Sequence, residues 1–364
     1  MKRRPVLASL GLGLILAAGC GGSTETADPG APDRRAAQNA GLPQLGLPLA
    51  GITVSGISAG GYMATQFHLA HADWIDGVAV LAAGPWRCAE GRLQQALGRC
   101  IDGGEAELET GRLAAEAREL AAAGRLAAAT ALAGDRVWIF RGTRDTVISA
   151  GVVRASAAFY REYAPEATVM LREDIDAVHG WPTMDFGAAC EGFDPPYLTA
   201  CGVDVAGHLL EALLGNLTSP EAAAPEEGLR RFDQRPFWPA RDGHSLHESG
   251  WVYVPQTCRE GGSHCRLHVV FHGCRQSEDF IGEAFVRHTG LNAWAEANGL
   301  VVLYPQVRPS RLRPLNPQGC WDWWGYSGAN YVERGAAQIA AVAAMLRHLA
   351  ETAHEAADAT AQAR

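Results

Sequence analysis

No basic tract occurs beyond the first four positions of this 364-residue sequence, and its formal net charge is −9. Because proteins that bind nucleic acid need clustered lysine and arginine, this balance argues against a nucleic-acid partner. The sequence also contains no Cys-x-x-Cys pair, a spacing that structural zinc sites commonly use, and we expect no metal or other cofactor. No internal repeat is visible. A hydrophobic fraction of 48% and a charged fraction of 20% are those of an ordinary globular protein.

The apolar stretch near the N-terminus is too short to span a bilayer comfortably. It follows basic residues 2–4, and together they predict a signal peptide over residues 1–19. The stretch ends in Leu-Ala-Ala-Gly-Cys, which resembles the lipobox of bacterial lipoproteins, so Cys20 is the expected lipidation site and membrane anchor. An ordinary secretory peptide is the alternative, because Ala17 stands where leucine is commoner. Residues 20–45, rich in Gly, Ser, Thr, Pro and Asp, predict a flexible tether.

Eight cysteines remain when Cys20 is set aside, and an even number in an exported chain favours four disulfides. Sequence alone does not fix their connectivity, and buried free thiols are the alternative. Local spacing nonetheless favours three short-range pairs and leaves one long-range pair: Cys88–Cys100, Cys190–Cys201, Cys258–Cys265 and Cys274–Cys320.

A Gly-x-Ser-x-Gly pattern occupies residues 56–60, with Ser58 at its centre. Apolar Ile52 and Val54 precede the pattern and a helix-like run, residues 62–70, follows it. Strand, tight turn and helix form the context of a nucleophile elbow, in which flanking glycines relieve crowding and the serine Oγ stands exposed. The pattern is common, so a glycine-rich turn with an incidental serine is the alternative.

Strand-like and helix-like segments alternate downstream of this pattern. Residues 77–84 read as a buried strand and residues 105–134 as a helix, and residues 136–148 read as a strand that runs into a loop. Residues 149–164 predict a further helix, and residues 167–183 a further strand and loop. This succession is typical of a mostly parallel α/β sheet.

The loops at the ends of these strands supply partners for the serine. In open α/β sheets the working residues gather beyond the carboxyl ends of the strands. Asp145 follows one predicted strand and His179 follows the next, which gives the chain order Ser58, Asp145, His179 that α/β-hydrolases use. In such a trio the histidine takes the serine proton, and the buried carboxylate orients the imidazole and stabilises its cation. Asp174 or Asp176 could replace Asp145 as the acid.

A second oxyanion donor normally comes from a loop that precedes the serine. Here the matching segment, an apolar strand ending in His-Gly-Cys at residues 266–274, lies far downstream. A strand at 299–306, an aromatic segment at 319–328 and a helix at 332–349 follow it, so the first half of an ordinary hydrolase occupies the C-terminal part of the chain. The sequence therefore predicts a circularly permuted α/β-hydrolase fold with a mostly parallel sheet and its nucleophile elbow near the N-terminus. We expect one catalytic domain over residues 46–352, followed by a tail, 353–364.

Five segments, GISAGGYMA, GTRDTVI, VHGWPT, FHGC and GCWDWWGY, occur in this order. Together they resemble the catalytic domain of extracellular poly(3-hydroxybutyrate) depolymerases of the permuted kind, over roughly residues 45–350. The resemblance implies an exported serine esterase that acts on a polyester or oligoester without a cofactor. It also implies that Ser58 is the nucleophile, Asp145 the acid and His179 the base. The main-chain amides of Ala59 and Cys274 would form the oxyanion hole. One tryptophan would line the polymer crevice, and the candidates are Trp321, Trp323 and Trp324.

The three tryptophans follow a Pro/Arg-rich loop, and loops carry function more often than cores do. An uncharged, methyl-bearing polyester would bind in an apolar, aromatic-lined groove, so we expect them to line one; a purely structural role in the core is the alternative. His264, His268 and His272 recur at even spacing, which places them on one face of a strand. No acidic residue nearby completes a metal site, and we interpret them as structural.

Two other functions remain open at this point. Feruloyl and acetyl xylan esterases share FHGC-type and GxSAGG-type motifs, so a carbohydrate-linked ester is a second substrate class. A surface lipoprotein that binds polymer without catalysis is a third reading. The trio Ser58, Asp145 and His179 argues against the third, because a binding protein does not need it.

Overall fold

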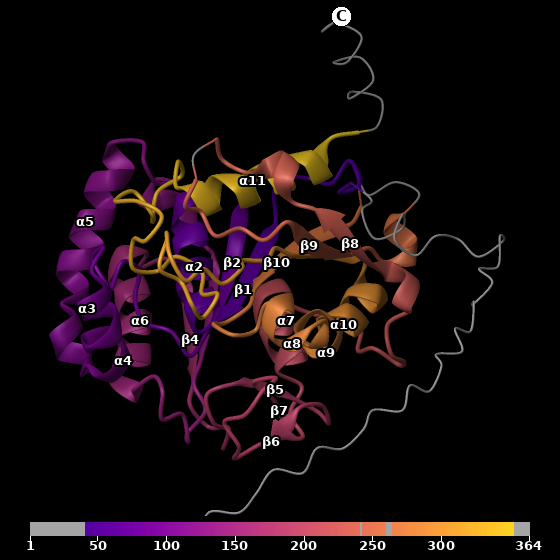
Figure 1. Cartoon of the computed structure of the whole chain (residues 1–364), viewed down its shortest axis with the longest axis horizontal. Helices are drawn as coiled ribbons and strands as arrows, with labels where there is room; N and C mark the ends of the chain where they lie inside the picture. The colour runs from indigo at the N-terminus through magenta and orange to yellow at the C-terminus, as the bar shows by residue number, and fades with distance from the viewer. Residues whose placement is uncertain (1–40, 241, 260–263, 353–364) are drawn as a thin grey trace, which may run out of the picture. The chain divides into compact units, whose positions relative to one another are not determined.

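The computed structural model describes residues 41–240, 242–259 and 264–352 (Figure 1). The predicted signal peptide, Cys20, most of the predicted tether and the tail 353–364 lie outside the described residues. The last residues assigned to the tether are packed instead, since Leu42 is buried. Within the described ranges, no helix combines the length and apolar character that crossing a bilayer would require.

An eight-stranded sheet, in the order β4-β3-β2-β1-β10-β11-β9-β8, forms the centre of the fold. Six neighbouring strands run parallel, whereas β9 and β8 at one edge are antiparallel. The mostly parallel α/β sheet predicted from the sequence is confirmed. The strands are β1 Ile52–Ile57, β2 Ile75–Leu81, β3 Arg136–Phe140, β4 Thr168–Arg172, β8 Leu229–Asp233, β9 Ser249–Tyr253, β10 Arg266–Phe271 and β11 Leu300–Tyr304.

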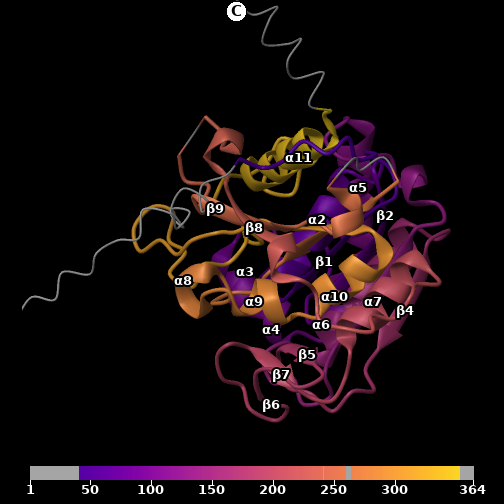
Figure 2. The same ribbon diagram turned by 90° about the vertical axis from the view of Figure 1, so that its right-hand side faces the viewer.

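Helices pack against both faces of the sheet and enclose two hydrophobic cores (Figures 1 and 2). Alternation along the strands divides the side chains between the cores: Val137 and Ile139 of β3 enter one, whereas Trp138 and Phe140 enter the other. The first core includes residues of α2 Ala59–Ala70, α5 Thr110–Ala122, α6 Ala150–Tyr163 and α11 Ala337–Ala350, and the second includes residues of α7 Val205–Leu214, α9 Ala284–His288 and α10 Leu291–Asn298.

Short elements complete the described part of the chain. The shorter α-helices are α3 Leu93–Leu97, α4 Arg99–Asp102 and α8 Glu278–Ile281, and a small sheet contains β5 Trp181–Thr183, β6 Ala188–Ala189 and β7 Leu198–Ala200. The 3-10 helices are η1 Glu105–Leu108, η2 Ala129–Leu132, η3 Glu226–Gly228, η4 Arg235–Phe237 and η5 Gln256–Cys258.

The helix predicted over residues 105–134 is wrong in its length, because the segment is divided into η1, α5 and η2. Glu109 adopts a left-handed conformation, with φ 42°, and separates η1 from α5. Gly124, with φ 72°, lies just beyond the end of α5. A left-handed residue cannot continue a right-handed helix, so high Ala, Leu and Glu content alone overestimates the helix.

All four predicted disulfide pairs are confirmed, namely Cys88–Cys100, Cys190–Cys201, Cys258–Cys265 and Cys274–Cys320. Three of them close loops of 12, 11 and 7 residues, and the fourth joins segments 46 residues apart.

The start of the described chain lies against the end of α11. The amides of Leu45 and Leu47 donate to the Leu349 carbonyl oxygen at 3.1 and 3.2 Å, and the Gly46 amide donates to the Glu351 carbonyl oxygen at 3.0 Å. A circular permutation requires such an adjacency, because the two segments would be consecutive in the unpermuted chain. The permutation itself stays a prediction.

Candidate active site

Ser58 occupies a sharp turn between the end of β1 and the start of α2. Its backbone is left-handed, with φ 56° and ψ −123°, a conformation that costs a non-glycine residue about 1–3 kcal/mol. Hydrogen bonds fix the turn on both sides: the Ser58 amide donates to the Leu81 carbonyl at 2.8 Å, and the Ser58 carbonyl accepts from the Tyr62 amide at 3.1 Å. This geometry is that of a nucleophile elbow.

The glycines of the Gly-x-Ser-x-Gly pattern are required by close backbone contacts. A Cβ at Gly56 would lie 2.1 Å from the Gly60 carbonyl oxygen, and a Cβ at Gly60 would lie 2.1 Å from the Phe271 carbonyl oxygen. No side chain fits at such distances. Gly60 therefore lets the end of β10 approach the elbow, although β10 lies more than 200 residues downstream.

His179 and Asp145 form a buried pair that follows two neighbouring strands, β4 and β3. The His179 Nδ1 lies 2.9 Å from Asp145 Oδ2, and the Asp145 side chain is fully buried. The other carboxylate oxygen, Oδ1, accepts the amides of Val147 and Ile148 at 2.8 and 2.9 Å. These contacts hold the carboxylate in place, and the pair leaves Nε2 of the imidazole available for a third group.

The alternative acids lie elsewhere. The Asp174 and Asp176 side chains are about 60% exposed and pair with Arg172 and Arg144 respectively. Neither carboxylate contacts His179, so the geometry favours Asp145.

Ser58 and His179 line the same cavity, whose volume is about 400 Å³. Ala59 and Cys274, the predicted oxyanion donors, also lie on its wall. Among the described residues, neither main-chain amide donates a hydrogen bond to a protein acceptor. The remaining wall is mostly apolar, with aliphatic and aromatic side chains that include Leu93, Leu97, Phe193, Leu315, Trp323 and Trp324.

Gln276 anchors the loop that carries Cys274. Its Oε1 accepts the Gly273 amide at 2.8 Å, and its Nε2 donates to the Tyr197 carbonyl at 3.1 Å. The Gln276 side chain is buried, and the disulfide to Cys320 fixes the same loop from the other side. The loop is therefore tied to two separate segments of the cavity wall.

Two of the three predicted tryptophans line the cavity, and one does not. Trp323 and Trp324 belong to the wall, and the Trp323 ring stacks on Tyr62 with centroids 4.5 Å apart. Trp321 is fully buried in the core, where its ring lies edge-on to Phe271 at 5.0 Å. The prediction is wrong for Trp321, because its ring packs in the core against Phe271 and His272 instead of facing the cavity.

Asp322 organises the backbone between these tryptophans and the residues that follow. Its carboxylate accepts the amides of Gly325 at 2.7 Å, Tyr326 at 3.0 Å and Ser327 at 2.7 Å. Burial raises the pKa of this carboxyl, whereas the hydrogen bonds from Ser327, Gly325 and Tyr326 oppose that rise. The loop that presents Trp323 and Trp324 is thus fixed from within.

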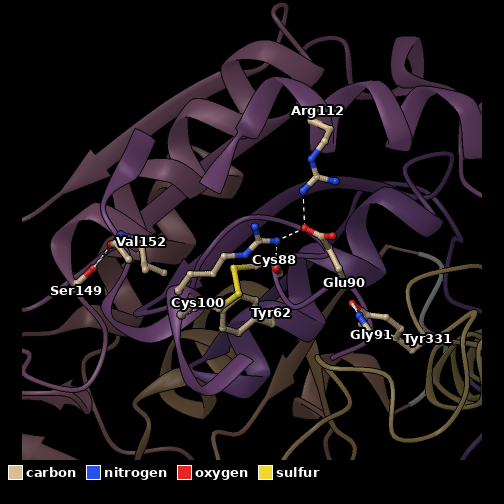
Figure 3. The surroundings of a disulfide bond; sticks show 11 residues. Tyr62, Cys88, Glu90, Gly91, Cys100, Arg112, Ser149, Val152 and Tyr331 are labelled. Atoms are coloured by element: carbon tan, nitrogen blue, oxygen red, sulfur yellow. Dashed lines mark hydrogen bonds and ion pairs between the residues drawn. A yellow bond between two sulfur atoms is a disulfide. The ribbon is translucent and has the colours of Figure 1, made fainter. Parts of the chain in front are cut away.

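The Cys88–Cys100 disulfide supports another part of the wall (Figure 3). The Tyr62 hydroxyl donates to the Cys100 carbonyl at 2.7 Å. The segment between Cys88 and Cys100 contains α3, whose first and last residues, Leu93 and Leu97, line the cavity. Sequence reasoning did not single out Tyr62, although its position four residues after Ser58 places it one helical turn from the elbow. Leu93 and Leu97 gave no such signal.

The histidines near β10 take structural positions. The buried His268 ring lies between the hydroxyls of Thr53 and Ser55, at 2.8 and 2.7 Å, and burial lowers the pKa of His268 to about 3. His272 is also buried and its Nδ1 donates to the Gly273 carbonyl oxygen at 2.7 Å. The prediction that all three lie on one strand is wrong, since β10 begins after the exposed His264 and ends before His272.

No family model matches the chain. The chain is 38% identical over 288 residues to a poly(3-hydroxybutyrate) depolymerase of Delftia acidovorans, over 78% of this chain and 56% of that protein. It is 32% identical over 302 residues to a polyhydroxybutyrate depolymerase of Talaromyces funiculosus, over 79% of this chain and 86% of that protein. The chain thus spans about half of the first relative and most of the second.

Two solved structures share the fold. A PHB depolymerase from Penicillium funiculosum matches with a TM-score of 0.74 and 28% identity, over 85% of this chain and 99% of that one. A PHB depolymerase complexed with an R3HB trimer matches with a TM-score of 0.75 over the same shares of both chains.

Proposed function

The chain belongs to the polyhydroxybutyrate depolymerase family, and we propose that it is an exported serine esterase that hydrolyses ester bonds of poly(3-hydroxybutyrate) or its oligomers. One observation carries this proposal: Ser58, on a strained elbow, and His179, paired with buried Asp145, line one apolar cavity. A serine, a histidine and a carboxylate in this relation perform acyl transfer.

The proposed reaction proceeds in two halves. His179 Nε2 takes the proton of Ser58 Oγ as the oxygen attacks the ester carbonyl, and the Ala59 and Cys274 amides donate to the oxyanion that develops. The C–O bond of the ester then breaks, and the leaving alkoxide takes the proton from His179. Water repeats the sequence on the acyl-enzyme, which releases a carboxylic acid and restores Ser58.

The cavity wall supports a polyester as the substrate. Aromatic and aliphatic side chains form most of it, and an uncharged chain with methyl branches loses little solvation there. One structure similar to this chain is described as complexed with an R3HB trimer, which suits the same class of ligand. A feruloyl or acetylated sugar ester would bring many hydroxyl groups against a wall that offers few hydrogen-bond partners.

Replacement of the serine tests the assignment of the nucleophile. Ser58→Ala should abolish clearing of a polymer emulsion with the fold intact, since breaking such a unit costs about 10⁶ in turnover. Labelling with a fluorophosphonate should disappear in the same variant. Substantial residual hydrolysis by a variant with an unchanged melting curve would refute the role of Ser58. Release of ferulate or acetate without clearing would favour the carbohydrate esterase.

Export through a lipid anchor belongs to the same proposal. Four disulfides and the N-terminal sequence support an oxidising location, and Cys20 follows the lipobox-like segment. Metabolic labelling with a palmitate analogue should mark the protein, and Cys20→Ala should release it from membranes. A soluble, unlabelled wild type would indicate an ordinary signal peptide.

A further inference from the structure

Arg275 places a cation on the wall of a cavity that is otherwise almost uncharged. Among the described residues that line the cavity, no aspartate or glutamate occurs and no other lysine or arginine does. Within the described part of the chain, the Arg275 guanidinium forms no ion pair with a carboxylate. An anion that enters the cavity could therefore pair with the guanidinium without displacing a carboxylate of the protein.

The position of Arg275 is well defined on both sides. Its amide donates to the Gln318 carbonyl at 2.7 Å, and its guanidinium carbon lies 5.4 Å from the centroid of the Tyr197 ring, a cation–π contact. Its neighbours are fixed too, Cys274 by a disulfide and Gln276 by buried hydrogen bonds. Arg275 also holds a left-handed backbone, with φ 60°, which a non-glycine residue seldom adopts.

The chemistry of the proposed substrate identifies the anion. A polyester chain is neutral along its length, but each oligomer that hydrolysis releases ends in one free carboxylate. A guanidinium presents a planar fork of N–H donors that matches the two oxygens of a carboxylate. An apolar cavity with one such group at its wall is suited to a short oligoester acid.

We propose that Arg275 is a specificity determinant that binds the terminal carboxylate of oligoesters held in the cavity, so that oligomers with a free acid end are preferred to their esters. This inference rests on the proposed function and names the substrate class of the same site.

Binding by an inactive protein tests the inference without turnover. In the Ser58→Ala background, calorimetry compares the trimer of (R)-3-hydroxybutyric acid with its methyl ester. The acid should bind about tenfold more tightly, as expected for a charge-assisted hydrogen bond that is partly open to water. Added Arg275→Gln should remove this preference, and Arg275→Lys should retain part of it because the charge remains. Both replacements keep a Cβ, so the strain of the left-handed backbone is matched.

Arg311→Gln is the matched control, because Arg311 is an exposed arginine of a neighbouring loop that does not line the cavity. It removes the same charge and should leave the preference for the acid unchanged. Higher ionic strength should weaken the preference in the Arg275 protein, since salt screens a partly exposed pair. Equal affinities for acid and ester in the Arg275 protein, or an equal loss of preference in the Arg311 variant, would overturn the inference. Absence of hydrolysis by the wild-type chain would instead contradict the proposed function, so the two failures are distinguishable.

Discussion

Asp145 shows how burial distinguishes one carboxylate from its neighbours. Three aspartates follow β3 and β4 within the same stretch of sequence, and only Asp145 is both buried and within 2.9 Å of His179. The other two end in solvent beside arginines. The sequence supplied the three candidate aspartates. Which of them can pair with His179 depends on which loop turns toward the interior, and the pattern of polar residues does not predict that.

Replacement of this residue tests its role. Asp145→Asn should lower turnover by about 10⁴, because an amide in place of the carboxylate favours the wrong imidazole tautomer. Asp176→Asn is a matched control, since it removes an exposed carboxylate that pairs only with surface groups, and should leave turnover nearly unchanged. Ester hydrolysis measured alongside thermal melting checks both. Comparable losses in the two variants would contradict the assignment.

The proposed role of the Cys274 loop in the oxyanion hole depends on how firmly the loop is held in position. Gln276 fixes it to the segment of Tyr197, and the Cys274–Cys320 disulfide fixes it to the tryptophan loop. An oxyanion donor acts only if it lies about 3 Å from the developing charge, and loss of one donor costs roughly 10²–10³ in turnover. Small displacements of this loop should therefore affect catalysis more than binding.

Opening the disulfide tests this expectation. The proposed donor is the main-chain amide of Cys274, so Cys274→Ser keeps the amide while freeing its loop. Cys274→Ser and Cys320→Ser should each lower turnover by similar factors, and the double variant should be no worse than either. Closure of a 46-residue span also stabilises the fold by about 4 kcal/mol in the chain-entropy model, so all three variants should melt earlier. Wild-type turnover in either single variant would contradict the positional role.

In the central sheet of the molecule, the spatial order of the strands differs from their order along the chain. β10 lies between β1 and β11, and β9 follows at the antiparallel edge, so the last third of the described chain supplies strands on one side of the elbow. The contacts of Leu45 and Leu47 with the end of α11 bring the two ends of the described domain together. These features suit a permuted hydrolase.

A rearranged chain tests the permutation. Linking Glu351 to Leu42 and opening the exposed loop between Pro220 and Glu221 would return the elbow to a place after β10 and β11. The fold should form and most of the esterase activity should remain, because the packed contacts are unchanged and the new junction joins segments already hydrogen-bonded. Turnover and near-ultraviolet circular dichroism measure this. A chain that fails to fold would count against the permutation hypothesis; an opening between Gly243 and His244, beside a buried residue, serves as a disruptive comparison.

Sequence predicted the parallel strands and the three short-range disulfide pairs well, because each depends on local pattern, but it did not predict the antiparallel strands β8 and β9. It also placed Ser58, Asp145 and His179 at the ends of strands, and their catalytic roles stay a prediction. It located only part of the cavity. Leu93, at the start of α3, and Phe193 reach the wall within the segments closed by the Cys88–Cys100 and Cys190–Cys201 disulfides. Trp321 instead packs in the core. The positions of these side chains depend on how separate segments of the chain pack together. The spacing of residues along the sequence does not predict that packing.

The Asp322 carboxylate has a thermodynamic consequence for binding. By holding the amides of Gly325, Tyr326 and Ser327, it keeps the turn that carries Trp323 and Trp324 in one conformation before any ligand arrives. Freezing a side chain or loop costs entropy, and a site that is ordered only by its ligand subtracts that cost from the affinity. Here the entropy of ordering the turn is lost when the chain folds, before a ligand binds. If the proposed polyester binds against these rings, it therefore has to lose only its own conformational freedom.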